Sequence, residues 1–239
     1  MRYLHFGSDW IQGAMRIARP WNLELEYTRE MMASLLLRDD ADWPRKVLLI
    51  GLGAASLTKF LYRHFPLAHL TVVEIEPAVV AAARQFFKLP EDPRRIDLVI
   101  GDGAEYMLED GKRFDLILVD GYDEKASSGA LNTLPFYQAC RTRLSGTGIL
   151  SVNLLTSDRR FDANIKRIAE AFDDRVLACP SGESGNAIAL AASGDAVDIS
   201  FFDLRAKALE LNRETGLNLM PSIARLERSR SWYGGVLVL

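Results

Sequence analysis

The segment from Val47 to Ser56 constrains the fold of this chain more than any other part of the sequence. It reads VLLIGLGAAS, so a short apolar run leads directly into a turn that contains two glycines. A second apolar run, Leu70 to Val73, ends on Glu74. A buried strand, a tight glycine turn, a helix and a second strand that ends in a carboxylate are typical of a βαβ unit that binds a nucleoside or nucleotide. We therefore expect a parallel sheet with a ligand site at the carboxyl ends of its strands.

Apolar runs separated by helical segments extend this pattern over most of the chain. Runs that are apolar on both faces indicate parallel strands covered by helices on both sides. Two later runs joined by a short loop indicate an antiparallel pair at one edge of the sheet. The pattern predicts a doubly wound α/β, Rossmann-like fold. We expect parallel strands at 47–50, 70–73, 96–100, 116–119 and 149–152. We expect helices at 56–64, 77–88, 103–109, 132–143 and 158–172. The antiparallel pair is expected at 175–178 and 187–192.

The start of the chain has a different pattern. Residues 1–19 contain short β-rich runs around turn residues, which predicts a β-hairpin. Residues 24–37 place apolar side chains at helical spacing, which predicts a helix with one buried face. We therefore expect two domains: a small N-terminal β-hairpin and helix region at 1–44, and a Rossmann-like nucleoside-binding catalytic domain at 45–239.

The tail of the sequence, residues 201–230, has a helical apolar pattern and ends in a basic run. Arg225, Arg228 and Arg230 make up this run. Basic residues at the end of a helix most often form a solvated face, so we interpret the run in that way rather than as a binding site.

Composition argues against several classes of protein. The formal net charge of -3 gives no support for a nucleic-acid partner. The apolar runs are shorter than the roughly 18 residues of a membrane span, so we expect no membrane partner. Two cysteines, Cys140 and Cys179, are too few for a disulfide framework and favour a cytoplasmic protein. The three histidines, His5, His64 and His69, lack the spacing of metal ligands, so we expect no metal.

Residues suited to ligand binding close four of the expected strands. A single acidic strand end is equally well explained as a helix cap, whereas several in register favour a ligand site. Ser56 stands where the dinucleotide fingerprint has its third glycine, which disfavours a nicotinamide enzyme. We expect the glycines to bring backbone amides close to the ligand, the first carboxylate to bind ribose and the second to bind adenine. The residues are, in strand order, Gly51 and Gly53; Glu74; Asp102 and Gly103; and Asp120.

Asp120 is followed closely by a second carboxylate, Asp123. Two neighbouring carboxylates can accept a proton or hold an ammonium group. The alternative is an ordinary strand-end turn. The position favours catalysis, because the reacting part of a nucleoside bound at this edge would lie beside it. We therefore predict that both residues are catalytic.

Several separate segments of the chain, from Arg2 to about Ala192, resemble the spermidine synthase (polyamine aminopropyltransferase) family. That family has a fold of the S-adenosylmethionine-dependent methyltransferase type. The order and spacing of the segments are more specific than any one motif. They are Asp9–Gln12, Glu30–Ala33, the turn at Gly51, Val73–Glu76, Ile100–Gly103, Phe114–Asp120, and Pro180–Gly182 followed by Gly185.

The resemblance implies a transferase that moves an aminopropyl group from decarboxylated S-adenosylmethionine to a small-molecule amine, a polyamine acceptor, and releases methylthioadenosine. It implies that Gln12 contacts the nucleoside, Glu74 the ribose and Asp102 the adenine. It further implies that Asp120 is the catalytic base and that Asp123 helps to hold the amine. Because the family assembles through its N-terminal region, the resemblance also implies a homodimer.

The chain departs from the family pattern mainly where amines would bind. Ala54 stands where the family usually has an Asp that binds the aminopropyl ammonium group. Thr28 and Arg29 replace a Tyr-Gln pair, with Tyr27 one position away, and Cys179 replaces an aromatic residue. Arg29 is either a surface helix residue or a partner for the carboxylate of intact S-adenosylmethionine. Two alternatives therefore stay open: an S-adenosylmethionine-dependent methyltransferase on the same scaffold, and a non-catalytic nucleoside-binding homologue.

Overall fold

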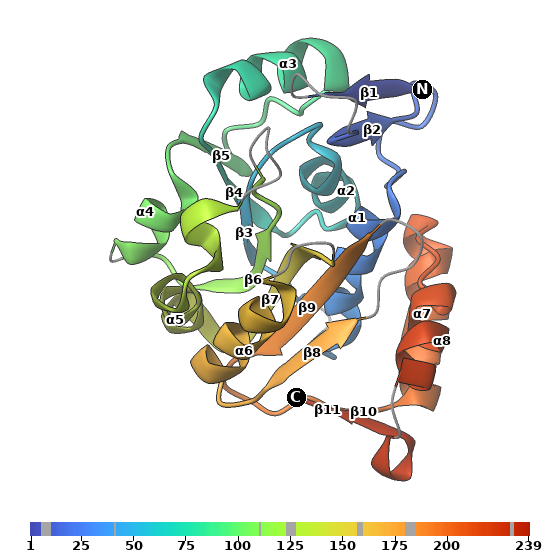
Figure 1. The fold of residues 1–239 in the computed structure, drawn as a ribbon. Coiled ribbons are helices and arrows are strands. Elements are labelled where there is room, and N and C mark those ends of the chain that lie inside the picture. Colours follow the sequence, from blue (N-terminus) through green and yellow to red (C-terminus); the bar gives the residue numbers. More distant parts are fainter. Residues whose placement is uncertain are drawn as a thin grey trace.

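A seven-stranded sheet forms the centre of the molecule (Figure 1). The computed structural model describes residues 1–5, 11–40, 42–109, 111–122, 128–156, 160–179, 185–229 and 232–239. The strands of the sheet, in spatial order, are β5 (Ile96–Ile100), β4 (His69–Glu74), β3 (Lys46–Ile50), β6 (Phe114–Val119), β7 (Leu144–Leu155), β9 (Asn186–Ala192) and β8 (Val176–Cys179).

The strand order reverses direction at the centre of the sheet. From β3 the chain moves outward through β4 to β5, then returns to β6 on the other side of β3. Strands β3 to β7 are mutually parallel, whereas β9 runs antiparallel to both β7 and β8. This confirms the predicted doubly wound fold and its antiparallel edge. In such a sheet, ligands bind at the carboxyl ends of the strands, where the order reverses.

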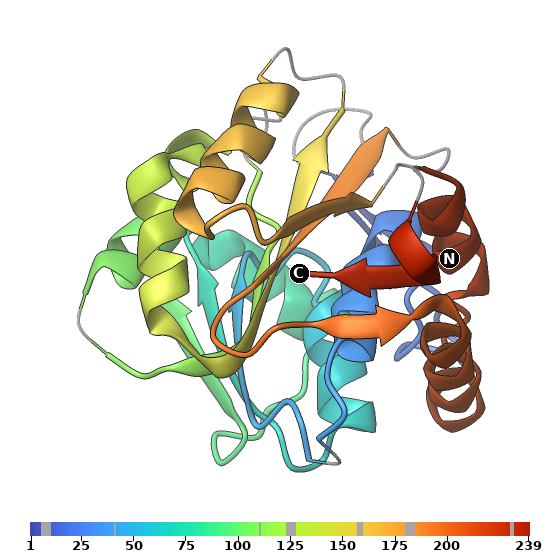
Figure 2. The ribbon, with the colours of Figure 1, turned by 90° about the horizontal axis from the view of Figure 1, so that it is seen from below.

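Helices cover both faces of the sheet (Figure 2). Helices α4, α5 and α6 pack on one face, and the remaining α-helices, with the 3₁₀ helix η1, pack on the other. Their bounds are α1 (Glu26–Met31), η1 (Met32–Leu36), α2 (Ser56–His64), α3 (Pro77–Phe87), α4 (Gly103–Leu108), α5 (Leu134–Arg143), α6 (Phe161–Ala171), α7 (Phe201–Thr215) and α8 (Met220–Ser229), and two further 3₁₀ helices are η2 (Gly129–Asn132) and η3 (Tyr233–Gly235).

Alternation along the strands explains the two layers. On β3, Val47 and Leu49 point into the core beneath α1 and α2, while Leu48 and Ile50 point into the core beneath α4 and α5. All four side chains are at most 3 % exposed. Each buried side chain of this size contributes roughly 1.5–3 kcal/mol to folding. The uninterrupted apolar run in the sequence thus reflects a strand that is buried on both sides.

The N-terminal hairpin consists of β1 (Arg2–Leu4) and β2 (Gly13–Met15), which pair antiparallel. The predicted hairpin is present, and its tip falls outside the described residues. The region predicted as one helix, 24–37, is α1 followed by η1. Met31, Met32 and Leu36 of this region belong to the same core as the sheet. The division of the chain at residue 44 stays a prediction.

The C-terminal arm, residues 198–239, contains the helical structure expected over 201–230 as two helices, α7 and α8, and adds two short strands. It begins with β10 (Asp198–Ser200) and ends with β11 (Val236–Val238), which pair antiparallel. Between them α7 ends at Gly216, whose φ of 77° is the left-handed conformation that terminates helices. Helix α8 then runs beside α7, and the arm lies next to α1 and η1 (Figures 1 and 2).

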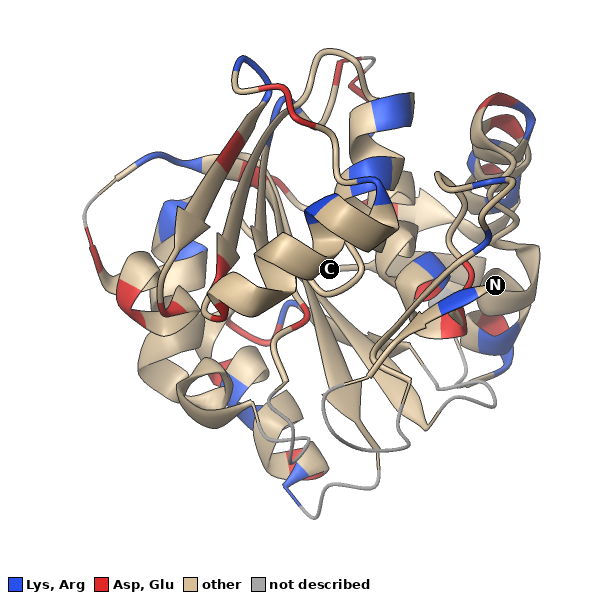
Figure 3. Cartoon of the chain, turned by 90° about the horizontal axis from the view of Figure 1, so that it is seen from above, with Lys and Arg blue, Asp and Glu red and all other residues tan. Residues whose placement is uncertain are grey.

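Charged residues of both signs are interspersed over the described chain (Figure 3). Within the described ranges, no helix combines the length and apolar character needed to cross a bilayer.

Candidate active site

The glycine turn follows β3 and contacts the carboxyl end of β6. Gly51 has a φ of 93°, and a Cβ atom built on it would lie 2.2 Å from the carbonyl oxygen of Asp120. The backbone amide of Asp120 in turn donates to the carbonyl oxygen of Ile50, 2.9 Å away. Glycine is therefore required at position 51, because the two strand ends meet backbone to backbone. Gly53 has a φ of 50° and faces more open space.

Glu74 fastens the end of β4 to this turn. One carboxylate oxygen accepts a hydrogen bond from the amide of Leu52 at 2.8 Å, and the other accepts one from the amide of Glu76 at 3.0 Å. The residue is 7 % exposed. An ionised carboxylate has about four acceptor sites, so Glu74 can hold the turn and still accept from a ligand hydroxyl.

Asp102 caps helix α4. Its Oδ1 atom accepts hydrogen bonds from the amides of Ala104 at 2.7 Å and Glu105 at 3.3 Å. The structure therefore shows the cap that the sequence offered as the alternative to a ligand role. Both bonds use Oδ1, so binding of adenine through Oδ2 stays a prediction. A Cβ on Gly103 would lie 2.3 Å from Cγ2 of Ile50, which assigns that glycine to close helix–strand packing.

Two exposed isoleucines stand beside these carboxylates. Ile75, which follows Glu74, is 58 % exposed, and Ile100 at the end of β5 is 51 % exposed. Neither was singled out in the sequence. Apolar surface at the ligand-binding edge of a sheet suits the flat face of an aromatic base.

Asp120 lies at the centre of a chain of hydrogen bonds. The Nδ2 atom of Asn153 donates to its Oδ1 at 2.8 Å, and the Nδ2 atom of Asn186 donates to Oδ1 of Asn153 at 2.8 Å. The hydroxyl group of Tyr27, on α1, lies within reach of the same carboxylate and acts on its pKa as a hydrogen-bond donor. The hydroxyl group of Tyr122 donates to the carbonyl oxygen of Asn153 at 2.8 Å. These contacts fix the carboxylate at the point where the strand order reverses.

Burial raises the pKa of Asp120 above its ordinary value. Hydrogen bonds from Asn153 and Tyr27 act in the opposite direction, and the nearby charge of Glu74 raises the pKa further. The pKa of Tyr27 is also well above its ordinary value, first because of burial and then because of Asp120. Tyr27 therefore stays a hydrogen-bond donor, while Asp120 is a stronger base than an exposed carboxylate.

The structure brings together several of the site residues predicted from the sequence. Gly51, Glu74 and Asp120 share contacts at the sheet edge. Gln12 reaches the same turn through its backbone, because a Cβ on Gly53 would lie 3.8 Å from the carbonyl oxygen of Gln12. Asp123 lies outside the described residues, so its role stays a prediction.

Sequence reasoning missed two amide residues of the site. Asn153 directly follows the expected strand 149–152, so the strand-end rule that selected Asp120 could also have found it. Asn186 stands opposite Leu155 in the antiparallel pair. Only the register of β9 against β7 brings it to Asn153, and a local pattern contains no signal for that register.

Comparisons with known proteins agree with this geometry. The sequence model of the spermine/spermidine synthase domain matches residues 25–156. A polyamine aminopropyltransferase of Chromobacterium violaceum is 35 % identical over 239 residues, which is 100 % of this chain and 90 % of the relative. One of Neisseria meningitidis is 34 % identical over 229 residues, 96 % of this chain and 86 % of the relative. This chain belongs to the spermine/spermidine synthase family. The predicted family and enzyme class, a transferase, are confirmed.

Solved structures support the same assignment. A spermidine synthase in complex with the transition-state analogue AdoDATO superposes with a TM-score of 0.68 at 26 % identity, over 85 % of this chain and 72 % of that one. Human methyltransferase-like protein 13 in complex with SAH gives a TM-score of 0.71 at 24 % identity, over 87 % of this chain and 95 % of that one. The latter likeness concerns the fold alone, and together they confirm the methyltransferase-type architecture.

Two positions that depart from the family pattern have a clear structural setting. Ala54 is 3 % exposed and packs in a small apolar cluster with Met15 and Phe87. A Cβ on Gly13 of the hairpin would lie 2.5 Å from the Cβ of Ala54. The hairpin therefore covers this part of the glycine turn, and the position contributes apolar surface instead of a charge.

Arg29 is held by the turn that precedes α1. Its Nη1 atom donates to the carbonyl oxygens of Leu23 at 3.1 Å and Glu24 at 2.7 Å. This arrangement corresponds to the structural alternative for Arg29 rather than to a contact with a ligand carboxylate.

In the described ranges, no group of three or more His, Cys, Asp or Glu side chains is arranged to hold a metal ion.

Proposed function

We propose that this protein moves an aminopropyl group from decarboxylated S-adenosylmethionine to a small polyamine acceptor, with Asp120 as the catalytic base. The observation that carries the proposal is the setting of Asp120. Its carboxylate closes the central strand β6, accepts hydrogen bonds from Tyr27 and Asn153, and has a raised pKa. A fixed carboxylate with raised basicity at this position is suited to receive a proton from a bound amine.

The reaction requires little of the protein beyond positioning and one proton acceptor. The acceptor amine attacks the methylene carbon beside the sulfonium, a C–N bond forms, and the C–S bond breaks to release methylthioadenosine. The nitrogen must lose a proton, and Asp120 accepts it. Because a sulfonium is already a good leaving group, alignment of the two reactants supplies much of the rate. Asp123, three residues after Asp120, would hold the charged end of the amine.

The nucleoside half of the site supports the same proposal. Gly51 holds the turn against the end of β6, and Gly53 leaves open space beside it, so a ligand can approach the amides of the turn. Gln12 and Glu74 lie at this turn, and the exposed Ile75 and Ile100 offer faces for an adenine ring. We infer that the ligand is an S-adenosylmethionine-type co-substrate that lies across β3, β4 and β6.

A second candidate function is methyl transfer from intact S-adenosylmethionine. The observation that favours it is Ala54, which is buried and apolar where the family usually has a carboxylate for the aminopropyl ammonium group. A neutral wall does not attract a cation. The two candidates therefore differ in the form of the co-substrate that the site prefers.

Calorimetric titration with both nucleosides, followed by mass spectrometry of products, tests the proposal. We expect tighter binding of the decarboxylated form and an aminopropylated product from a panel of di- and triamines. The Asp120→Asn variant should bind methylthioadenosine as the wild type does but give no product. Preference for intact S-adenosylmethionine with methylated amines would establish the second candidate, whereas binding without any product would establish a non-catalytic homologue.

Association into a homodimer stays a prediction. The hairpin region exposes apolar side chains, among them Tyr3 at 48 %, Ile11 at 46 % and Ile17 at 51 %. A second copy of the chain would remove this surface from water. Sedimentation of wild type and an Ile11→Lys/Ile17→Lys variant would test it, with a shift to the monomer expected for the variant.

A further inference from the structure

Arg225 of α8 forms ion pairs with two carboxylates of α1. Its Nη2 atom lies 3.2 Å from Oε1 of Glu26 and also contacts Oε1 of Glu30. The Glu30 side chain is 2 % exposed, and that of Arg225 is 24 % exposed. The interpretation of the basic run as a solvated face is therefore wrong for Arg225. Arg228 is exposed, as that interpretation requires.

Glu30 depends on Arg225 for compensation of its charge. Neither carboxylate oxygen of Glu30 has a well-directed hydrogen bond among the described residues. A buried carboxylate that loses its cation either takes up a proton or moves toward water. In the first case the attraction between α1 and α8 is lost, and in the second the position of α1 relative to α8 changes.

Helix α1 is also the element that carries Tyr27 to Asp120. Tyr27 stands between Glu26 and Glu30, one residue after the former and three residues before the latter, so the two glutamates flank it along less than two turns of helix. A shift of α1 that follows loss of the ion pair would therefore move the Tyr27 hydroxyl group relative to the Asp120 carboxylate.

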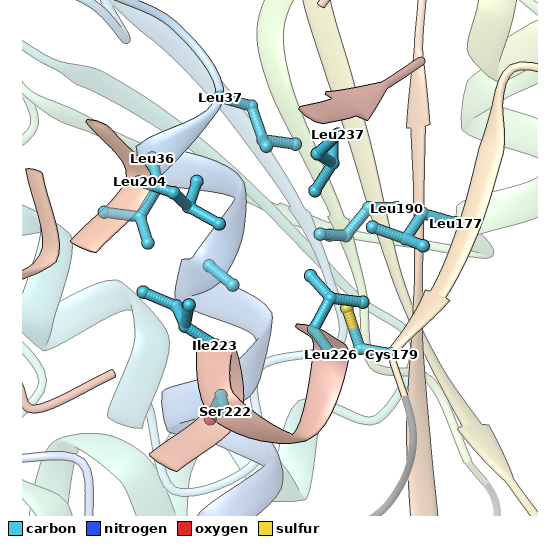
Figure 4. Close-up of a pocket in the computed structure, with 11 residues that line it drawn as sticks. Leu36, Leu37, Leu177, Cys179, Leu190, Leu204, Ser222, Ile223, Leu226 and Leu237 are labelled. Carbon is cyan, nitrogen blue, oxygen red and sulfur yellow. The ribbon is translucent and has the colours of Figure 1, made fainter. Parts of the chain in front are cut away.

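Apolar packing alone leaves room for such a shift. A small apolar cavity lies between η1, which directly continues α1, and α8, with Ile223 and Leu226 of α8 opposite Leu177 and Leu190 of the sheet (Figure 4). A void provides few contacts that oppose movement of its walls. Met31 packs α1 against the core of the sheet, and the ion pairs of Arg225 join the same helix to the arm.

A second cation, Lys207, binds the C-terminal end of the α1–η1 segment. The Nζ atom of Lys207, on α7, donates to the carbonyl oxygens of Leu36 at 3.1 Å and Arg38 at 3.2 Å. It also pairs with Asp39. The C-terminal arm thus contacts the α1–η1 segment at both ends. The family model matches residues 25–156 and does not include the arm.

We propose that Arg225 is a positioning residue for the catalytic base: through Glu26 and Glu30 it fixes α1, and α1 holds Tyr27 against Asp120. The proposal deepens the proposed function and rests on it. It assigns the C-terminal arm a part in catalysis without contact between the arm and the substrate.

A double-mutant cycle tests whether Arg225 acts through Tyr27. At acid pH, with decarboxylated S-adenosylmethionine and 1,4-diaminobutane, we expect Arg225→Met to lower kcat about tenfold and to leave the KM of the nucleoside within about twofold. On a Tyr27→Phe background the same replacement should lower kcat less than twofold. Arg225→Lys, which keeps the charge, should restore most of the activity, and Arg228→Met on the same helix should match the wild type.

Wild-type kcat for Arg225→Met at acid pH would overturn the proposal, and so would a full tenfold loss on the Tyr27→Phe background. If Arg225→Met does not fold, the Arg225→Met/Glu30→Gln variant removes both charges, and the same cycle on that variant decides. The matched control in each case is Arg228→Met.

A readout that needs no turnover separates this proposal from the proposed function. In protein that contains 3-fluorotyrosine, the ¹⁹F resonance of residue 27 is assigned from its loss in Tyr27→Phe. We expect that resonance to move in Arg225→Met and to stay in place in Arg228→Met, even if neither amine nor nucleoside proves to be a substrate. An unmoved resonance in Arg225→Met would overturn the positioning role whatever reaction the site performs.

Discussion

Replacement of Tyr27 by Phe removes one hydrogen bond from the Asp120 carboxylate and little else. The Tyr27 hydroxyl group donates to that carboxylate, and its bond lowers the pKa of Asp120 against the larger effect of burial. Without the hydroxyl group, the ionised form of Asp120 loses a donor while the protonated form loses much less. The pKa of Asp120 must therefore rise in Tyr27→Phe.

The magnitude follows from the strength of a hydrogen bond to a charged group. Such a bond contributes about 1.5–3 kcal/mol, and each 1.4 kcal/mol is a factor of ten in an equilibrium. A base is active only when ionised. At acid pH, where Asp120 is mostly protonated in both proteins, kcat/KM of Tyr27→Phe should therefore be roughly 10–100-fold below that of the wild type. At alkaline pH both carboxylates are ionised, so the two rates should converge.

The assay is the pH dependence of kcat/KM, measured by release of methylthioadenosine. Tyr62→Phe is the matched control, because Tyr62 also donates to a carboxylate, Oδ2 of Asp92 at 3.2 Å, outside the site. Its profile should overlay that of the wild type. If Tyr27→Phe lowers the rate by the same factor at every pH, Tyr27 does not act through the ionisation of Asp120 and the reasoning fails.

Three further predictions concern binding and stability. Glu74→Ala should weaken methylthioadenosine binding by about 1–3 kcal/mol in calorimetry, because the glycine turn and the ribose lose a charged acceptor; unchanged affinity would exclude that role. Gly51→Ala should lower the free energy of unfolding in urea by more than about 2 kcal/mol, since its Cβ would lie 2.2 Å from a carbonyl oxygen, whereas Gly53→Ala, in open space, should cost about 1 kcal/mol; equal losses would contradict the close contact. Burial lowers the pKa of Lys59 to about 8. Between pH 8 and 10.5 the unfolded chain therefore binds more protons than the folded one, so the free energy of unfolding of the wild type should rise by roughly 3 kcal/mol relative to that of Lys59→Met. Parallel curves of stability against pH for the two proteins would refute the shift.

Much of the fold could be predicted because its signals are local. A strand buried on both faces is a continuous apolar run, and the helices between such strands have their own spacing, so the central sheet and the helices around it were predicted correctly. The helical character of the C-terminal arm was predicted as well, but its two short strands and the break between its helices were not. Its strands pair residue 198 with residue 238, and the break at Gly216 depends on a left-handed conformation that a helical apolar pattern does not reveal.

The site residues also fall into those that a local pattern predicts and those that depend on distant packing. Glu74 and Asp120 close parallel strands, so their approach follows from the fold class. Tyr27 and Asn186 reach Asp120 and its partner only through packing of α1 and pairing of β9. Asp102 shows the reverse case, because its helix cap is a local feature and yet the strand-end pattern favours a ligand role.

The contact between Gly13 and Ala54 has a consequence for the placement of the hairpin. Because a Cβ atom added to Gly13 would lie only 2.5 Å from the methyl group of Ala54, position 13 of the hairpin has no space for one more carbon. Any side chain at position 13 would therefore push the hairpin away from the glycine turn. The closeness of the hairpin to the ligand-binding edge of the sheet thus depends on a glycine that lies outside the turn itself.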